Sequence, residues 1–145
     1  MAIRIRNNLR KRRLPTALLG KRLANLLRSL GIPDAELSIL FVGDRAMRTL
    51  NRTWRGKDTT TDVLSFSLRE GKFPPLRYDM LGDIVISVPA AIRQAKAAGH
   101  AVAVELERLL IHGLAHLLGY EHERSVREAR RMENKEQQLL KRMGV

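Results

Sequence analysis

The chain of 145 residues contains no cysteine, and it has no apolar stretch near the roughly 20 residues that a membrane-spanning helix needs. The missing cysteine excludes disulfide bonds and thiolate metal sites. Lys21 and Arg22 interrupt the leucines near the N-terminus, so this segment lacks the apolar core of a signal peptide. The sequence also lacks internal repeats, low-complexity tracts and linkers. We therefore predict one domain over residues 1–145 of a cytoplasmic protein with no membrane partner.

Acidic residues are scarce as well. Fifteen Asp and Glu stand against 27 Lys and Arg, which gives a formal net charge of +12 at pH 7. Between Met1 and Pro33 there are nine basic residues and no acidic one. Such an excess favours a polyanionic partner, RNA or DNA above all.

Hydrophobic periodicity predicts regular elements along the whole chain. The first half should form a strand over residues 3–6, a helix capped by Thr16 and ended by Gly31 and Pro33, a strand over residues 36–42, and a helix capped by Asp44 that reaches about Thr53. The second half should first form strands over residues 61–68 and 82–88. Three helices should follow: one opened by Ser87 and Pro89 and ended by Gly99, and one from about Val102 to Leu118. The last should be opened by the capping box of residues 125–128. The order β-α-β-α-β-β-α-α-α predicts an α+β domain in which about five helices cover a four-stranded sheet.

Histidine is rare too, and three of the four histidines fall between His112 and His122. His112 and His116 are four residues apart, so on a helix they are separated by about 40° around the axis and share one side. Gly119 stands where a helix ends and can turn the chain in a left-handed conformation. That turn would let His122 meet the other two imidazoles.

Three neutral histidines with one open position form a catalytic zinc site, whereas structural zinc sites fill all four positions with protein ligands. We therefore predict one zinc ion bound by His112, His116, His122 and a water molecule. The same spacing is similar to that of metzincin proteases, in which a glutamate general base directly follows the first histidine. Here that position is Gly113, so a protease lacks its base and becomes the weaker alternative.

Four arginines of the second predicted helix lie within about 80° of one another around the axis: Arg45, Arg48, Arg52 and Arg55. No acidic residue lies among them, and bound phosphate would relieve their mutual repulsion. Met47, Leu50 and Trp54 occupy the other side of this helix, and we expect them to face the core.

The segments LNRTWRGKDTTTDVLSFS, LGDIVIS and HGLAHLLGYEH together resemble the YbeY family of bacterial rRNA maturation factors. The matching segments run from about Leu50 to His122. The resemblance implies a mixed sheet with helices and a zincin-like metal site, with His112, His116 and His122 as metal ligands. It also implies that Arg55 is catalytic. One departure is visible, because the family usually has Asp before the last histidine and this chain has Glu121.

The resemblance further implies a metal-dependent endoribonuclease specific for single-stranded RNA. Its partners would be ribosomal RNA and the small ribosomal subunit with its assembly factors, in 3′-end maturation of 16S rRNA and ribosome quality control. Zinc would lower the pKa of a bound water, and Arg55 would stabilise charge on the phosphate.

Several assignments stay open from the sequence. The general base is not assignable, although Glu121 and the hydroxyls of residues 59–61 are near if the fold brings them there. Asp62 and Asp83 are better explained as turn or strand-end residues than as site residues. A different class of function also fits the charge: a non-catalytic ribosome assembly factor whose metal only stabilises the fold.

Overall fold

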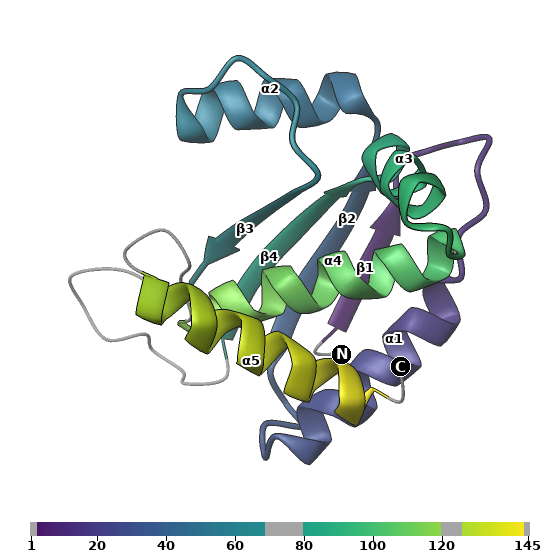
Figure 1. The fold of residues 1–145 in the computed structure, drawn as a ribbon. Helices are drawn as coiled ribbons and strands as arrows, with labels where there is room; N and C mark the ends of the chain where they lie inside the picture. The colour runs from purple at the N-terminus through teal and green to yellow at the C-terminus, as the bar shows by residue number, and fades with distance from the viewer. Residues whose placement is uncertain (1–2, 69–79, 120–125, 144–145) are drawn as a thin grey trace.

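The structure is a computed structural model that describes residues 3–68, 80–119 and 126–143. The elements, in chain order (Figure 1), are β1 Ile3–Asn7, α1 Thr16–Ser29, β2 Glu36–Val42, α2 Asp44–Arg55, β3 Val63–Ser67, β4 Met80–Ser87, α3 Val88–Ala98, α4 Val102–Leu117 and α5 Val126–Arg142. Their type and order confirm the predicted α+β class. The described helices include none with the length and apolar character needed to cross a membrane.

The four strands form one mixed sheet in the order β1-β2-β4-β3. β2 is parallel to both β1 and β4, whereas β3 is an edge strand antiparallel to β4. The register places Arg4, Ser38, Asp83 and Phe66 in one row across the sheet. Because side chains alternate between the two faces of a strand, these four share a face.

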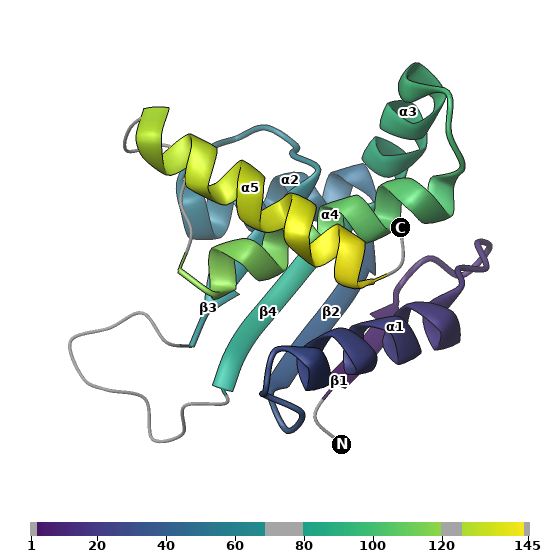
Figure 2. The ribbon, with the colours of Figure 1, turned by 60° about the horizontal axis from the view of Figure 1, so that its bottom comes forward.

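Four helices cover the other face of the sheet. α1, α3, α4 and α5 lie on that side (Figure 1), and α5 lies across α4 (Figure 2). The apolar residues between them and the strands are fully buried, among them Leu23, Phe41, Ile84 and Leu110. Burial of this apolar face is the main force that holds the helices on the sheet.

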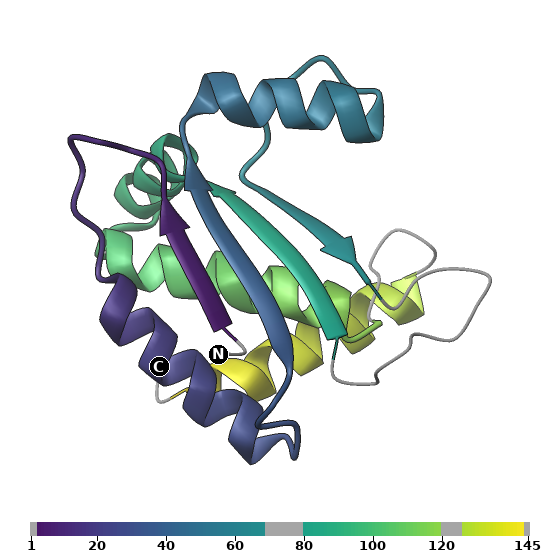
Figure 3. The same cartoon turned by 180° about the vertical axis from the view of Figure 1, so that it is seen from behind.

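α2 crosses the opposite face near one end, and none of the other described helices lies on that face, which we call the open face (Figure 3). A small apolar cluster of Val42, Met47, Leu64 and Val85 holds α2 there. Met47 is thus buried as predicted, but the prediction for Trp54 is wrong, because its side chain is 66% exposed. Trp54 lies two turns beyond Met47, past the cluster, at the C-terminal end of the helix.

The helix caps agree only in part with the prediction. Ser87 caps α3, since its hydroxyl accepts a hydrogen bond from the amide N–H of Ala90. Thr16 and Asp44 are instead the first residues of their helices, and neither N-cap position makes a side-chain capping bond. The capping box predicted at residues 125–128 begins outside the described residues.

Asp44 binds other elements in place of its own helix end. Its carboxylate accepts hydrogen bonds from the Ser87 hydroxyl at 2.9 Å and from the Arg93 guanidinium at 2.8 and 3.2 Å. Arg93 holds the pKa of Asp44 below its usual range. Asp44 therefore ties the start of α2 to α3.

Candidate active site

α4 presents two of the predicted metal ligands on one side. His112 and His116 are half-buried, and their ring centroids lie 4.9 Å apart. The neighbouring α4 residues Ile111, Leu114 and Ala115 are buried against the rest of the domain. The helical period thus separates a packed side from a side that carries the imidazoles, as the four-residue spacing predicts.

The end of α4 also agrees with the sequence. Gly119 has a φ of 99°, and its N–H donates to the carbonyl of His116 at 3.0 Å. The predicted positive-φ turn is therefore confirmed. His122 and Glu121 lie outside the described residues, so convergence of all three histidines remains a prediction. Within residues 3–68, 80–119 and 126–143, no group of three potential metal ligands comes together.

Glu136 of α5 contacts His112, one of these two histidines, and was not predicted from the sequence. Its carboxylate forms a hydrogen bond with His112 Nδ1. Metal-binding histidines commonly use one ring nitrogen for such an orienting carboxylate and the other for the metal. A signal for Glu136 did exist in the sequence. It interrupts an apolar stripe of Met132, Leu139 and Met143 at helical spacing, all three of which are buried.

A cavity of about 630 Å³ brings the remaining predicted residues to the histidines. Its walls come from α2, α4, β3 and the segment before β3, and include His112, His116, Arg55, Asn51, Asp62 and the three threonines 59–61. We call this space the histidine cavity. The fold therefore does bring Arg55 and these threonines to one site with the two histidines. Asn51 was not singled out from the sequence; it is buried and donates to the carbonyl of Thr59 at 2.9 Å.

Arg55 is the last residue of α2, which ends there because Gly56 adopts a left-handed conformation with φ 71°. The Arg55 guanidinium donates a hydrogen bond to the carbonyl of Ser65 and lies 5.2 Å from the centre of the Phe66 ring. Both contacts are with the edge strand β3. They hold the guanidinium at the rim of the histidine cavity.

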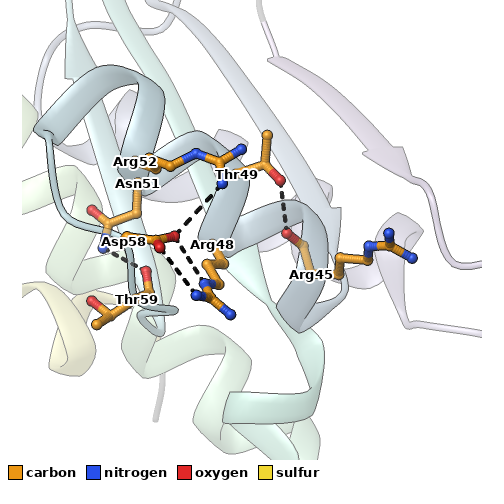
Figure 4. Close-up of polar contacts among 7 residues, drawn as sticks. All are labelled: Arg45, Arg48, Thr49, Asn51, Arg52, Asp58 and Thr59. Atoms are coloured by element: carbon orange, nitrogen blue, oxygen red, sulfur yellow. Dashed lines mark hydrogen bonds and ion pairs between the residues drawn. The ribbon is translucent and has the colours of Figure 1, made fainter.

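The other α2 arginines are not equivalent to Arg55. Arg48 forms two hydrogen bonds with the Asp58 carboxylate, at 2.9 and 3.1 Å, and Arg52 lies 3.7 Å from the same carboxylate (Figure 4). Arg48 holds the pKa of Asp58 below its usual range. Asp58 therefore relieves repulsion that the sequence interpretation had left to bound phosphate. Arg45 points away from this group (Figure 4).

Gly113 faces the sheet rather than the histidine cavity. A Cβ atom there would lie 2.8 Å from Ile84 Cγ2 and 3.1 Å from Ser65 Oγ. A glutamate at this position would collide with the sheet. The packing of α4 thus excludes a metzincin-type base at residue 113.

The two aspartates of the strand regions have separate environments. Asp62 accepts hydrogen bonds from its neighbour's N–H, that of Val63, at 2.8 Å and from Gln94 at 3.0 Å. These bonds give it the role of a strand-end residue, although it also lines the histidine cavity. Asp83 lies on the open face of the sheet, where partial burial raises its pKa.

Comparison with known proteins gives one consistent result. The sequence profile described as Endoribonuclease YbeY matches residues 4–144. A protein named Endoribonuclease YbeY from an Anaeromyxobacter species is 50% identical over 145 residues, which cover 100% of this chain and 73% of that protein. One of the same name from Geobacter sulfurreducens is 44% identical over 97% of this chain and 94% of that protein. The solution structure of a Thermotoga maritima protein matches with a TM-score of 0.68 and 26% identity, over 97% of this chain and 88% of that one. The chain therefore belongs to the YbeY endoribonuclease family.

Proposed function

We propose that this protein is a zinc-dependent endoribonuclease that hydrolyses single-stranded RNA. Its cellular role would be 3′-end maturation of 16S rRNA and ribosome quality control in the cytoplasm, with the small ribosomal subunit as partner. The observation that carries the proposal is the meeting of Arg55 from α2 with His112 and His116 from α4 at one cavity. Family membership and the net charge of +12 support an RNA substrate.

The donors fit a zinc ion. His112, His116 and the predicted third ligand His122 would hold it. Because Glu136 binds the Nδ1 atom of His112, this histidine would bind the metal through its Nε2 atom. When bound, zinc supplies a Lewis acid and a coordinated water whose pKa is near neutrality.

Arg55 would bind the scissile phosphate. A guanidinium offers five N–H donors in a planar fork that matches phosphate oxygens, and one bond to Ser65 leaves donors for this role. A guanidinium fixed at the cavity rim would stabilise the negative charge that grows on the phosphate in the transition state.

Threonines 59–61 line the same cavity. A hydroxyl both donates and accepts, so they would orient the ribose or the non-bridging phosphate oxygens. Asn51 holds this segment through the carbonyl of Thr59. The general base is not assigned by these groups, and Glu121 remains a candidate.

The test compares two arginines of one helix. Purified wild type, Arg55→Ala and Arg45→Ala would be incubated with end-labelled single-stranded RNA, with His116→Ala to exclude contaminating nucleases. We expect Arg55→Ala to lower turnover by about 10²- to 10³-fold, while metal content by mass spectrometry is unchanged. Arg45, exposed and pointing away from Asp58 (Figure 4), should have little effect on turnover.

Two results would contradict the proposal. Loss of metal from Arg55→Ala would make this residue structural. Wild-type protein that binds the RNA without cutting it would instead support the non-catalytic assembly factor.

A further inference from the structure

A second cavity lies on the open face of the sheet. Its volume is also about 630 Å³, and its walls include Arg4, Arg6, Leu50, Trp54, Phe66 and Asp83. We call it the open-face trough. β1, β2, β4 and β3 form its floor, and the C-terminal half of α2 forms one side.

Trp54 stands at the wall of this trough. It is the only tryptophan of the chain, and 66% of its side chain is exposed. The indole meets the Phe66 ring edge-on, with centroids 6.2 Å apart. The phenyl ring therefore supports the indole, and the exposed remainder of the indole can stack on a planar ligand.

The trough and the histidine cavity meet at the edge strand β3. Ser65 and Ser67 line the histidine cavity, whereas Phe66 between them lines the trough. Arg55 touches both sides, since it binds the Ser65 carbonyl and lies over the Phe66 ring. A chain bound at Arg55 therefore reaches Trp54 by crossing one strand edge.

Positive charge continues beyond Trp54. Arg4 and Arg6 are exposed on β1 and face the trough. β1 lies three strand spacings from β3, which is about 14 Å at about 4.8 Å per spacing. Asp83 lies in the same row as Arg4 and Phe66, and its carboxyl group can take hydrogen bonds from base amino groups or ribose hydroxyls.

We propose that the RNA strand extends from Arg55 across the β3 edge into the open-face trough, where a base next to the scissile phosphate stacks on Trp54. The backbone phosphates beyond that base pass over Arg4 and Arg6. This path rests on the proposed function of the histidine cavity. Only an unpaired base can stack on a side chain in this way. The pair of rings formed by Trp54 and Phe66 would therefore favour single-stranded over double-stranded RNA.

The fluorescence of Trp54 provides the direct test, because no other tryptophan contributes. Full-length His116→Ala protein would be titrated with a short single-stranded RNA. Binding would be followed separately by the anisotropy of a label on the RNA. We expect quenching of Trp54 emission and reduced access of acrylamide to the indole, and no such change with a blunt duplex of the same sequence. RNA binding with unchanged emission and unchanged acrylamide access would overturn the proposal.

Substitutions then separate stacking from general stability. Trp54→Ala should raise the Kd for single-stranded RNA by about 5- to 150-fold, and Trp54→Tyr should restore most of the affinity. Leu18→Ala is the matched control, because Leu18 is 52% exposed on α1, outside both cavities. Equal Kd values for Trp54→Ala and wild type, with matching thermal melts, would refute the path.

Salt dependence tests the far end of the trough. Each phosphate contact in a single strand contributes about 0.7 to the slope of log K against log salt. Arg4→Ala and Arg6→Ala should each lower the slope by about that amount, whereas Trp54→Ala should leave it unchanged. An unchanged slope in both arginine variants would exclude the path over β1.

These results are distinguishable from failure of the proposed function. If wild type does not cut RNA but the RNA still quenches Trp54, the binding path stands and the catalytic role fails. If cleavage depends on Arg55 but Trp54 neither responds nor contributes, the path is wrong and the catalytic role stands.

Discussion

Replacing Gly113 with alanine tests how closely α4 approaches the sheet. The added Cβ atom would lie 2.8 Å from Ile84 Cγ2 and 3.2 Å from Ile84 Cδ1. Ile84 is fully buried on β4, which has β2 and β3 on either side. Its side chain therefore cannot move aside without disturbing the core. Overpacking of this kind costs about 1–3 kcal/mol of stability.

Helix propensity acts in the opposite direction. Alanine in a helix interior is better than glycine by about 1 kcal/mol. We therefore expect Gly113→Ala to destabilise the protein by about 0–2 kcal/mol, which is the overpacking cost less the propensity gain. Gly20 of α1 is the milder comparison, because a Cβ there would meet only the end of the half-buried Ile5 side chain, whose Cδ1 atom at 3.3 Å has to move by a few tenths of an ångström. Gly20→Ala should stabilise the protein by about 0.5–1 kcal/mol.

Urea unfolding followed by circular dichroism would measure both variants against wild type. The slopes of free energy against urea should be equal, so that a change in midpoint reports stability alone. If Gly113→Ala is as stable as Gly20→Ala, α4 does not pack on the sheet as closely as described. A glutamate side chain at residue 113 would then not be excluded by the packing of α4.

Two further predictions concern carboxylates that join separate elements. Because Arg93 lowers the pKa of Asp44, ionised Asp44 stabilises the fold above the unfolded-state pKa, and this stability is lost as the pH falls through the lower folded-state pKa. Asp44→Asn should therefore lower the Tm at pH 7, with a deficit that shrinks below about pH 4; a deficit that stays constant down to pH 2 would contradict this. Glu136→Gln should weaken zinc binding by about 10- to 100-fold in a chelator competition, because the orienting charge at His112 is removed. Glu133→Gln, an exposed position one turn earlier on α5, should bind zinc as wild type does, and equal affinities of all three proteins would show that Glu136 does not act on the metal.

Local patterns were sufficient for most of the fold. Alternating and helical periodicities predicted the order of the nine elements that the described residues form, because each pattern reflects one face buried against a core. The errors arose where a partner far away in the sequence decides the outcome. Asp44 is a good capping residue by type, but Ser87 and Arg93 compete for its carboxylate. Trp54 has the helical phase of a core residue, but the apolar cluster under α2 ends before it.

The sequence likewise predicted only the local features of the candidate site. The sequence by itself determined that His112 and His116 share one side of a helix and that Gly119 turns the chain, because both follow from the helical repeat and from the conformational freedom of glycine. Only the tertiary structure decided that Arg55 and threonines 59–61 line one cavity with these histidines and that Glu136 holds one of them. Those contacts join segments far apart in the chain, so they depend on how α2, α4 and α5 pack on the sheet. Local periodicity predicts which face of each helix is buried, but it does not predict which other element will pack against that face.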